Sequence, residues 1–151
     1  MGGAILSGLL KSGFNPDDVS VSTKSTASAE RLTDELGVLS FAMENGDDAN
    51  QMAVAGANVI LIGVKPAYVT EVLADIADSL DDNALVISVA AGVTTAAMEK
   101  VLPEDVGVVR AMPNTPSIVG RGLTGISAGS RATDWAVETA VQLFETVGKT
   151  L

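Results

Sequence analysis

Short aliphatic runs alternate with amphipathic helical segments along the whole chain, and this alternation is the strongest constraint on its fold. The clearest run, residues 59–64, reads Val-Ile-Leu-Ile-Gly-Val and contains no polar residue. Such a run is typical of a parallel strand covered on both faces, because a strand with one solvated face alternates apolar and polar residues. Residues 68–80 instead carry Val69, Leu73 and Ile76 at helical spacings of four and three. Short connections between such segments favour right-handed β-α-β units.

The same patterns place the remaining elements. Strands are predicted at residues 19–22, 38–41, 59–64, 84–89, 106–112 and 123–127. Helices are predicted at residues 2–12, 27–36, 47–55, 68–80, 94–102 and 134–147. Gly13, Gly37 and Gly148 each follow a predicted helix and are expected to end it. We therefore expect one α/β domain over residues 1–151, with a doubly wound, mostly parallel sheet of the Rossmann type.

The first element is a helix, although a domain of this kind is expected to open with a strand. In the usual strand order 3-2-1-4-5-6, the first strand lies at the centre of the sheet. Without it, the strands at residues 19–22 and 59–64 would flank an open slot with unpaired backbone groups. We expect the first strand to be missing and the domain to be incomplete at its N-terminus.

Composition and charge exclude several classes of function. Nine basic and 19 acidic residues give a net charge of −10, which repels nucleic acid and anionic membranes. The chain has no His and no Cys, so Ser–His–Asp triads, thiolate nucleophiles and metal sites built on these residues are excluded, and no metal is expected. No apolar stretch of about 20 residues and no leader pattern is visible, so we expect a cytoplasmic protein.

Two segments near the N-terminus indicate a dinucleotide. Gly2 and Gly3 open the first predicted helix, where they match the tail of a G-x-G-x-x-G loop that holds a pyrophosphate at a helix N-terminus. A glycine pair is also typical of an ordinary loop. Ser22, Thr23 and Lys24 follow the next strand, where NAD-binding domains usually carry Asp or Glu. Hydroxyls and an ammonium suit a 2′-phosphate instead, which favours NADP, with an ordinary polar turn as the alternative.

Three further segments follow later strands, and open α/β sheets bind ligands at the carboxyl ends of their strands. Small residues allow a ring or ribose to approach closely, and prolines make the turns rigid, although the same residues also suit purely structural turns. For Ala90-Ala91-Gly92, a tight turn is as good an explanation as a ligand contact. The segments are Gly63-Val64-Lys65-Pro66, Ala90-Ala91-Gly92 and Arg110-Ala111-Met112-Pro113-Asn114-Thr115-Pro116.

In this order and spacing, these segments resemble pyrroline-5-carboxylate reductase, and the resemblance covers residues 1–151. The family reduces the cyclic imine Δ1-pyrroline-5-carboxylate to L-proline with NAD(P)H, the last step of proline biosynthesis. The resemblance implies an oxidoreductase that uses NADP or NAD, a small imino acid as substrate, and a homodimer or higher homo-oligomer. It also implies a separate helical dimerisation domain that this chain lacks, so we expect the chain alone to be inactive.

The resemblance assigns roles to individual positions. Gly2 and Gly3 match the pyrophosphate loop, Ser22 a serine near the adenosine ribose, and Asn50 an asparagine that contacts the cofactor. Gly63 stands where the family usually has alanine and begins the Val64-Lys65-Pro66 segment along the cofactor. The nicotinamide end is assigned to Ala90, Ala91, Gly92, Met112, Pro113 and Asn114, with Asn114 as a residue that positions the reactants.

Two other functions are compatible with the same residues. One is a different NADP-dependent dehydrogenase of this superfamily acting on a carbonyl, although such enzymes commonly use a lysine or histidine as acid–base and the chain has no histidine. The other is a truncated, non-catalytic nucleotide-binding domain that keeps only the fold.

Overall fold

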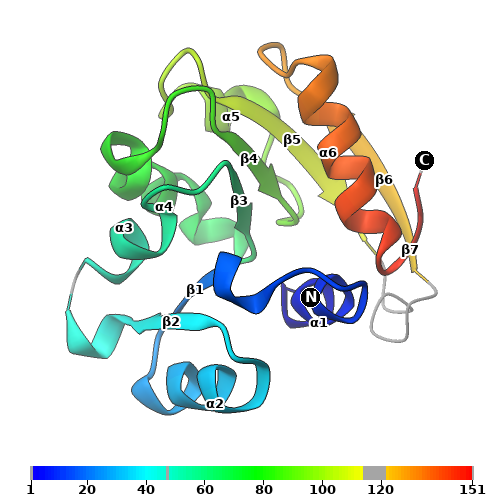
Figure 1. Ribbon diagram of the computed structural model, residues 1–151. Coiled ribbons are helices and arrows are strands. Elements are labelled where there is room, and N and C mark those ends of the chain that lie inside the picture. The colour runs from blue at the N-terminus through cyan, green and yellow to red at the C-terminus, as the bar shows by residue number, and fades with distance from the viewer. Residues whose placement is uncertain (1, 47, 114–121, 151) are drawn as a thin grey trace.

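The computed structural model describes residues 2–46, 48–113 and 122–150, and it shows a sheet between layers of helices (Figure 1). The described strands are β1 (Ser20–Thr23), β2 (Leu39–Ala42), β3 (Val59–Ile62), β4 (Leu85–Ser88), β5 (Gly107–Met112), β6 (Gly122–Ala128) and β7 (Gly148–Thr150). The described α-helices are α1 (Gly2–Lys11), α2 (Thr26–Leu36), α3 (Ala49–Val54), α4 (Val69–Ile76), α5 (Thr95–Glu99) and α6 (Asp134–Glu145). None of the helices in these ranges combines the length and the apolar character needed to cross a bilayer.

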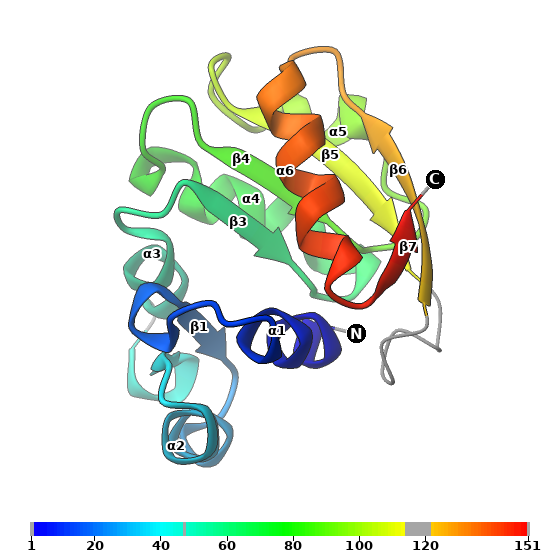
Figure 2. The same ribbon diagram turned by 45° about the vertical axis from the view of Figure 1, so that its right-hand side comes forward.

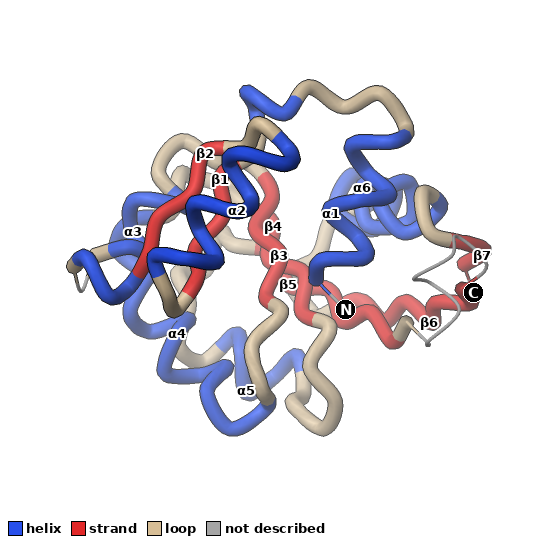
Figure 3. The backbone as a smooth tube through the Cα atoms, turned by 90° about the horizontal axis from the view of Figure 1, so that it is seen from below, coloured by secondary structure: helices blue, strands red, loops and turns tan. Residues whose placement is uncertain are grey.

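The described strands form two sheets that are not hydrogen-bonded to each other. One has the order β3-β4-β5-β6-β7, and its neighbours are parallel except for the antiparallel pair β5 and β6. The other is the parallel pair β1-β2, which lies on the β3 side of the larger sheet (Figure 3). The predicted class, doubly wound and mostly parallel, is confirmed, and the sheet is interrupted between β1 and β3 as expected.

The larger sheet buries both of its faces, as the apolar run of β3 and the pattern of β4 predict. On one face, Leu85 and Ile87 of β4 pack in a cluster with Ile5 of α1 and Phe144 of α6. On the other, Val86 packs in a cluster that includes residues of α4 and α5. Figure 2 shows α6 in front of this sheet and α4 behind it. Each fully buried aliphatic side chain contributes about 1.5–3 kcal/mol, so this two-sided sheet supplies most of the core.

The main departure from the predicted elements lies at the end of the chain. The last helix was expected to run to residue 147 and to end at Gly148, which is wrong. It ends at Glu145, Val147 is buried in the core, and Gly148 begins β7, which pairs with β6. Gly37, by contrast, caps α2 in the left-handed conformation at φ 74°, as predicted. Local sequence detected the helix but not the short edge strand, because three residues carry too little periodicity.

Candidate functional site

The carboxyl ends of β3, β4 and β5 lie at one edge of the larger sheet, whereas β6 runs in the opposite direction. The segments after β3, β4 and β5 share this edge because these strands are parallel. The start of α1, marked N, lies on the same side (Figure 3). The separate β1-β2 pair is tied to this edge by Lys24, whose Nζ lies 5.7 Å from the centre of the Tyr68 ring after β3. The structure thus gathers segments that are far apart in the sequence.

Ser22 and Asn50, which the sequence assigns to the same ligand, are in direct contact. The Ser22 hydroxyl donates a 2.6 Å hydrogen bond to Oδ1 of Asn50, which joins β1 to α3. Both side chains are half-buried, so their remaining polar groups still reach the surface. This pair forms a fixed polar corner beside the end of β1.

Thr23 and Lys24 differ in how they are held. The Thr23 hydroxyl donates to the backbone carbonyl of Ser25 at 2.9 Å and so shapes the turn into α2. Lys24 is exposed and is held near the Tyr68 ring by a cation–π contact, which leaves its ammonium accessible. Of the two, Lys24 is therefore the residue that can meet an anion.

Glu44 is a charged neighbour of this corner that the sequence analysis missed. Its Oε2 accepts a 3.1 Å hydrogen bond from the backbone N–H of Thr26 at the start of α2. Its own N–H donates to the carbonyl of Lys24 at 3.2 Å. From the sequence, a carboxylate was expected only directly after β1. Since β2 runs parallel to β1 in register, with Thr23 opposite Ala42, residues just after β2 also reach this corner.

The segment after β3 is fully accessible. Residues 63–66 are exposed, and Pro66 starts a short 3₁₀ turn, η3 (Pro66–Tyr68), with no side-chain cap from Lys65. Lys65 therefore presents its charge to solvent at the edge of the sheet. The backbone of this segment is positioned by β3 and η3 rather than by side-chain bonds.

The segment after β4 turns sharply at Gly92. Ala90 is buried, and its N–H donates to the Ser88 hydroxyl at 3.2 Å, whereas Ala91 is exposed. Gly92 has φ 77°, and a Cβ added there would meet no heavy atom within 4 Å. Glycine is thus required by the backbone conformation, and the space above the turn is open. An open surface of this kind can admit a flat ring.

The segment after β5 is described only in part. Met112 ends β5 with 47% of its surface exposed, and Pro113 is partly buried. Asn114, the proposed positioning residue, lies outside the described residues. Gly2 and Gly3 do lie at the start of α1, whose first turn carries no acidic residue. A negative ligand there would meet the positive end of the helix dipole without local repulsion.

Arg110, two residues before the end of β5, is a second residue whose importance was missed. Its Nε is shielded from solvent and finds no hydrogen-bond acceptor among the described residues, and its Nη2 lies 3.8 Å from the Met112 sulfur. The sequence offered a signal, because Arg110 is a charged residue inside an otherwise apolar predicted strand.

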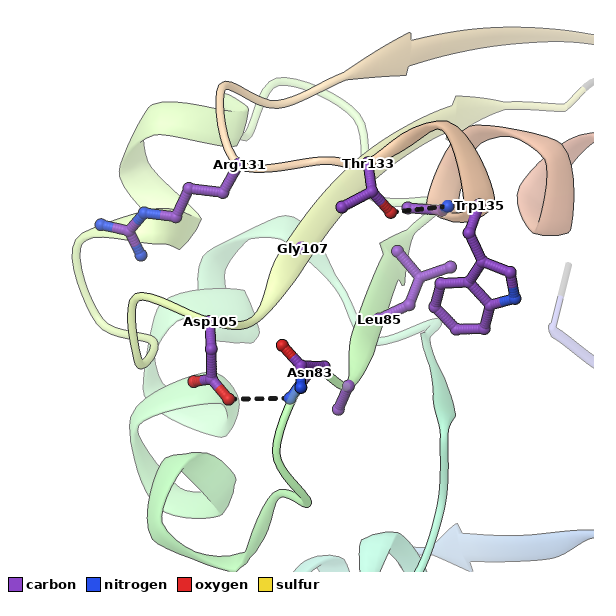
Figure 4. Close-up of a pocket in the computed structure, with 9 residues that line it drawn as sticks. Asn83, Leu85, Asp105, Gly107, Arg131, Thr133 and Trp135 are labelled. Carbon is purple, nitrogen blue, oxygen red and sulfur yellow. Dashed lines mark hydrogen bonds between the residues drawn. The ribbon is translucent and has the colours of Figure 1, made fainter.

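A cavity of about 210 Å³ lies at the opposite edge, near the amino ends of β4 and β5 (Figure 4). Trp135 and Leu85 line one side of it, and Asp105 accepts a 2.7 Å hydrogen bond from the N–H of Asn83 on the other. It contains none of the residues predicted to bind the cofactor. Within the described part of the chain, no group of three or more acidic side chains could hold a metal ion.

Comparison with known proteins identifies relatives of the whole chain. Residues 1–92 match the family described as "NADP oxidoreductase coenzyme F420-dependent". Pyrroline-5-carboxylate reductase of Corynebacterium melassecola is 35% identical over 154 residues, covering 100% of this chain and 55% of that protein. The chain thus spans about half the length of the curated relatives it matches.

Solved structures agree with this placement. A pyrroline-5-carboxylate reductase from Coxiella burnetii superposes with a TM-score of 0.90 at 31% identity, covering 99% of this chain and 54% of that one. The Plasmodium falciparum pyrroline carboxylate reductase, solved with NADP bound, gives a TM-score of 0.82 at 20% identity, covering 100% and 53%, and supports the fold alone. With the shared edge and the matched residues, these findings show that the chain belongs to the family described as NADP oxidoreductase, coenzyme F420-dependent.

Proposed function

We propose that this chain binds NADP(H) along the carboxyl edge and is the dinucleotide-binding part of a reductase that converts Δ1-pyrroline-5-carboxylate to L-proline. The observation that carries the proposal is that the separate segments singled out in the sequence meet at one edge of the fold. The similarity over the full length of the chain to pyrroline-5-carboxylate reductases supports the choice of substrate.

The residues along this edge suit successive parts of an NADP molecule. The N-terminus of α1, with Gly2 and Gly3, offers free N–H groups to the pyrophosphate. The corner of Ser22 and Asn50, with the exposed Lys24, suits the adenosine ribose and its 2′-phosphate. The open turn at Gly92 leaves room for the nicotinamide ring. The donor set therefore fits the cofactor.

The proposed reaction requires little acid–base or nucleophilic chemistry from the side chains. NADPH bound at this edge would supply a hydride, which the carbon of a protonated imine can accept without further activation. The chain's task would be alignment: the turn after β4 and the segment after β5 would orient the nicotinamide ring toward the imine. The absence of His and Cys is compatible with this reaction. Asn114 is proposed to orient the imine through its amide.

The assembly and location of the protein belong to the same proposal. We propose a cytoplasmic homodimer or higher homo-oligomer, and a chain that alone binds the cofactor without turning over. Support for the inactivity comes from the relatives, since the chain matches only about half of their length. The proposed substrate is a small imino acid, and no nucleic acid or membrane takes part.

A chimaera tests this function directly. In it, the chain replaces the matching part of the Corynebacterium melassecola reductase, and NADPH oxidation is followed with Δ1-pyrroline-5-carboxylate. We expect imine-dependent turnover by the chimaera and NADPH binding without turnover by the chain alone. A chimaera that binds NADPH but reduces no imine would favour a non-catalytic nucleotide-binding domain. A chimaera that reduces only carbonyl compounds would favour the other dehydrogenase class.

A further inference from the structure

The cavity at the amino edge of the larger sheet is separate from the site proposed for the cofactor. It lies near the starts of β4 and β5 and has a volume of about 210 Å³ (Figure 4). One water needs only roughly 10–15 Å³ of such space, so the cavity can admit a small organic molecule. None of the residues assigned to NADP(H) lines it. A ligand in this cavity would therefore bind independently of the proposed function.

Trp135, the only tryptophan of the chain, forms one wall of this cavity. It lies in the first turn of α6 with 49% of its surface exposed. The start of α6 is fixed, because the N–H of Ala136 donates to the Thr133 hydroxyl at 3.2 Å. Figure 4 shows the indole ring beside Leu85, with Asp105 across the cavity. An accessible indole face attracts flat groups and cations.

Asp105 supplies a carboxylate on the opposite side of the cavity. Its Oδ2 accepts a 2.7 Å hydrogen bond from the backbone N–H of Asn83, which joins the loops that precede β4 and β5. Among the described residues, no Lys or Arg nitrogen lies within 4.0 Å of this carboxylate. Asp105 is also exposed, so its charge is accessible to a cationic ligand.

Arg131 lines the cavity too, but its charge is already neutralised. Its Nε lies 3.4 Å from Oε2 of Glu99, and its Nη1 donates to the Glu99 carbonyl at 3.0 Å. The same Nη1 lies 3.4 Å from the carbonyl oxygen of Leu102 and 3.3 Å from that of Pro103. The guanidinium thus caps the end of α5 and extends away from Trp135 (Figure 4).

The loops around Asp105 are acidic as well. Residues 79–84 and 103–107 contain four carboxylates and no Lys or Arg, and Asp134 precedes Trp135. The resulting field attracts cations and repels the phosphates of a nucleotide. No three of the described acidic side chains converge on a point that could hold a metal ion. An organic cation therefore suits the cavity better than a metal ion or a nucleotide.

We propose that this cavity binds an organic cation, namely a guanidinium group on a short aliphatic stem. The flat guanidinium stacks on the indole ring of Trp135 and donates to the carboxylate of Asp105, while the stem lies beside Leu85. A guanidinium suits this site better than an ammonium because it is planar and more weakly hydrated. Such a group occurs in free small molecules and in the arginine side chains of proteins.

Titration of the full chain with n-butylguanidinium tests this proposal. Because Trp135 is the only tryptophan, its fluorescence reports on the cavity directly. The control ligand is n-butylurea, which has nearly the same shape without the charge, and free N-acetyltryptophanamide corrects for collisional quenching. The peptide acetyl-Gly-Arg-Gly-amide is titrated in parallel, to distinguish an arginine side chain from a free small cation.

We expect a saturable fluorescence change with n-butylguanidinium and at least about tenfold weaker binding of n-butylurea, because the neutral ligand forms no charge-assisted hydrogen bond. Tighter binding of the peptide would assign the cavity to an arginine of a protein partner, and tighter binding of n-butylguanidinium would assign it to a free small molecule. Quenching no greater than that of N-acetyltryptophanamide, or equal binding of n-butylguanidinium and n-butylurea, would overturn the proposal.

Two variants test the residues that form the site. Asp105→Asn keeps an acceptor for the Asn83 N–H but removes the charge, and should weaken n-butylguanidinium binding about 3- to 10-fold. Trp135→Leu should weaken it to a similar extent, measured by calorimetry, with circular dichroism to verify the fold. Glu35→Gln, which removes an exposed carboxylate of α2 outside the cavity, is the matched control and should change the affinity by less than about twofold. Equal effects of Asp105→Asn and Glu35→Gln, or full affinity in Trp135→Leu, would contradict the proposed site.

Discussion

Lys24 and Glu44 bring opposite charges to the start of α2, at the corner proposed for the 2′-phosphate. Glu44 occupies the N–H of Thr26, while Lys24 is exposed beside the Tyr68 ring. At the scale of single residues, we therefore expect the preference for NADPH over NADH to reflect a balance between an attractive ammonium and a repulsive carboxylate. The sequence alone suggested only the attractive half of this balance.

Opposite effects are predicted for neutralising these two residues. Lys24→Gln should weaken NADPH binding about 3- to 10-fold, because one charge-assisted contact to phosphate is lost. Glu44→Gln should strengthen NADPH binding by a few-fold, because a nearby like charge is removed. NADH affinity should change by less than about twofold in both. Fluorescence titrations measure this, with Lys100→Gln on the exposed end of α5 as control. Parallel changes in NADH and NADPH affinity would argue against a 2′-phosphate site.

At the scale of elements, α1 is held against the end of α6 at Gly8. A Cβ added to Gly8 would lie 2.7 Å from Cγ1 of Val147 and 3.0 Å from the carbonyl oxygen of Thr146. Val147 is 1% exposed, so its side chain has no room to move away. This close approach seats α1, whose N-terminus is proposed to hold the pyrophosphate.

Gly8→Ala is predicted to destabilise the fold despite improving helix propensity. The alanine gains about 1 kcal/mol in a helix interior. Overpacking typically costs about 1–3 kcal/mol, and here the backbone oxygen cannot yield. We expect a net loss of about 1 kcal/mol in the free energy of unfolding, measured by urea titration. Gly107→Ala is the matched control, because its Cβ would meet nothing closer than 3.6 Å. If Gly8→Ala and Gly107→Ala had the same free energy of unfolding, α1 would be free to move against α6.

On the scale of the whole molecule, the two sheets differ in how well they are buried. All four residues of β4 are buried, whereas β1 has no buried residue and β2 has only Ala42. Neither hydrophobic cluster includes a residue of β1 or β2. A two-stranded sheet is marginally stable unless other elements support it. The β1-β2 pair is therefore the weaker part of the described fold.

Hydrogen exchange should reveal this division. We predict that the backbone amides of β1 and β2 exchange at least about tenfold faster than those of β4, because local opening of the small sheet exposes little apolar surface. Exchange of the free chain, followed by mass spectrometry on peptides from both sheets, measures the difference. Uniform protection would mean that the two sheets unfold as one unit.

Most elements, and the edge proposed to carry the site, follow from local sequence. An uninterrupted apolar run such as residues 59–64 reports burial on both faces, and the alternation of strands and helices implies parallel strands whose carboxyl ends coincide. Ser22 and Gly92 could therefore be assigned to one edge before any coordinates, whereas Asn50 was assigned only through the resemblance to pyrroline-5-carboxylate reductase. Asn114 is still a prediction, because it lies outside the described residues.

Only the tertiary structure determines which charged residues lie close together. The register of β1 against β2 brings Glu44 to the backbone of Lys24, and no described residue provides a counter-ion for Arg110. Likewise, β7 forms because β6 offers it an edge. Periodicity along the chain reports how each segment is buried, whereas electrostatics and strand edges depend on contacts between distant segments. Local pattern thus determined the fold class and the edge proposed for the cofactor, and tertiary contacts determined the balance of charges at that edge.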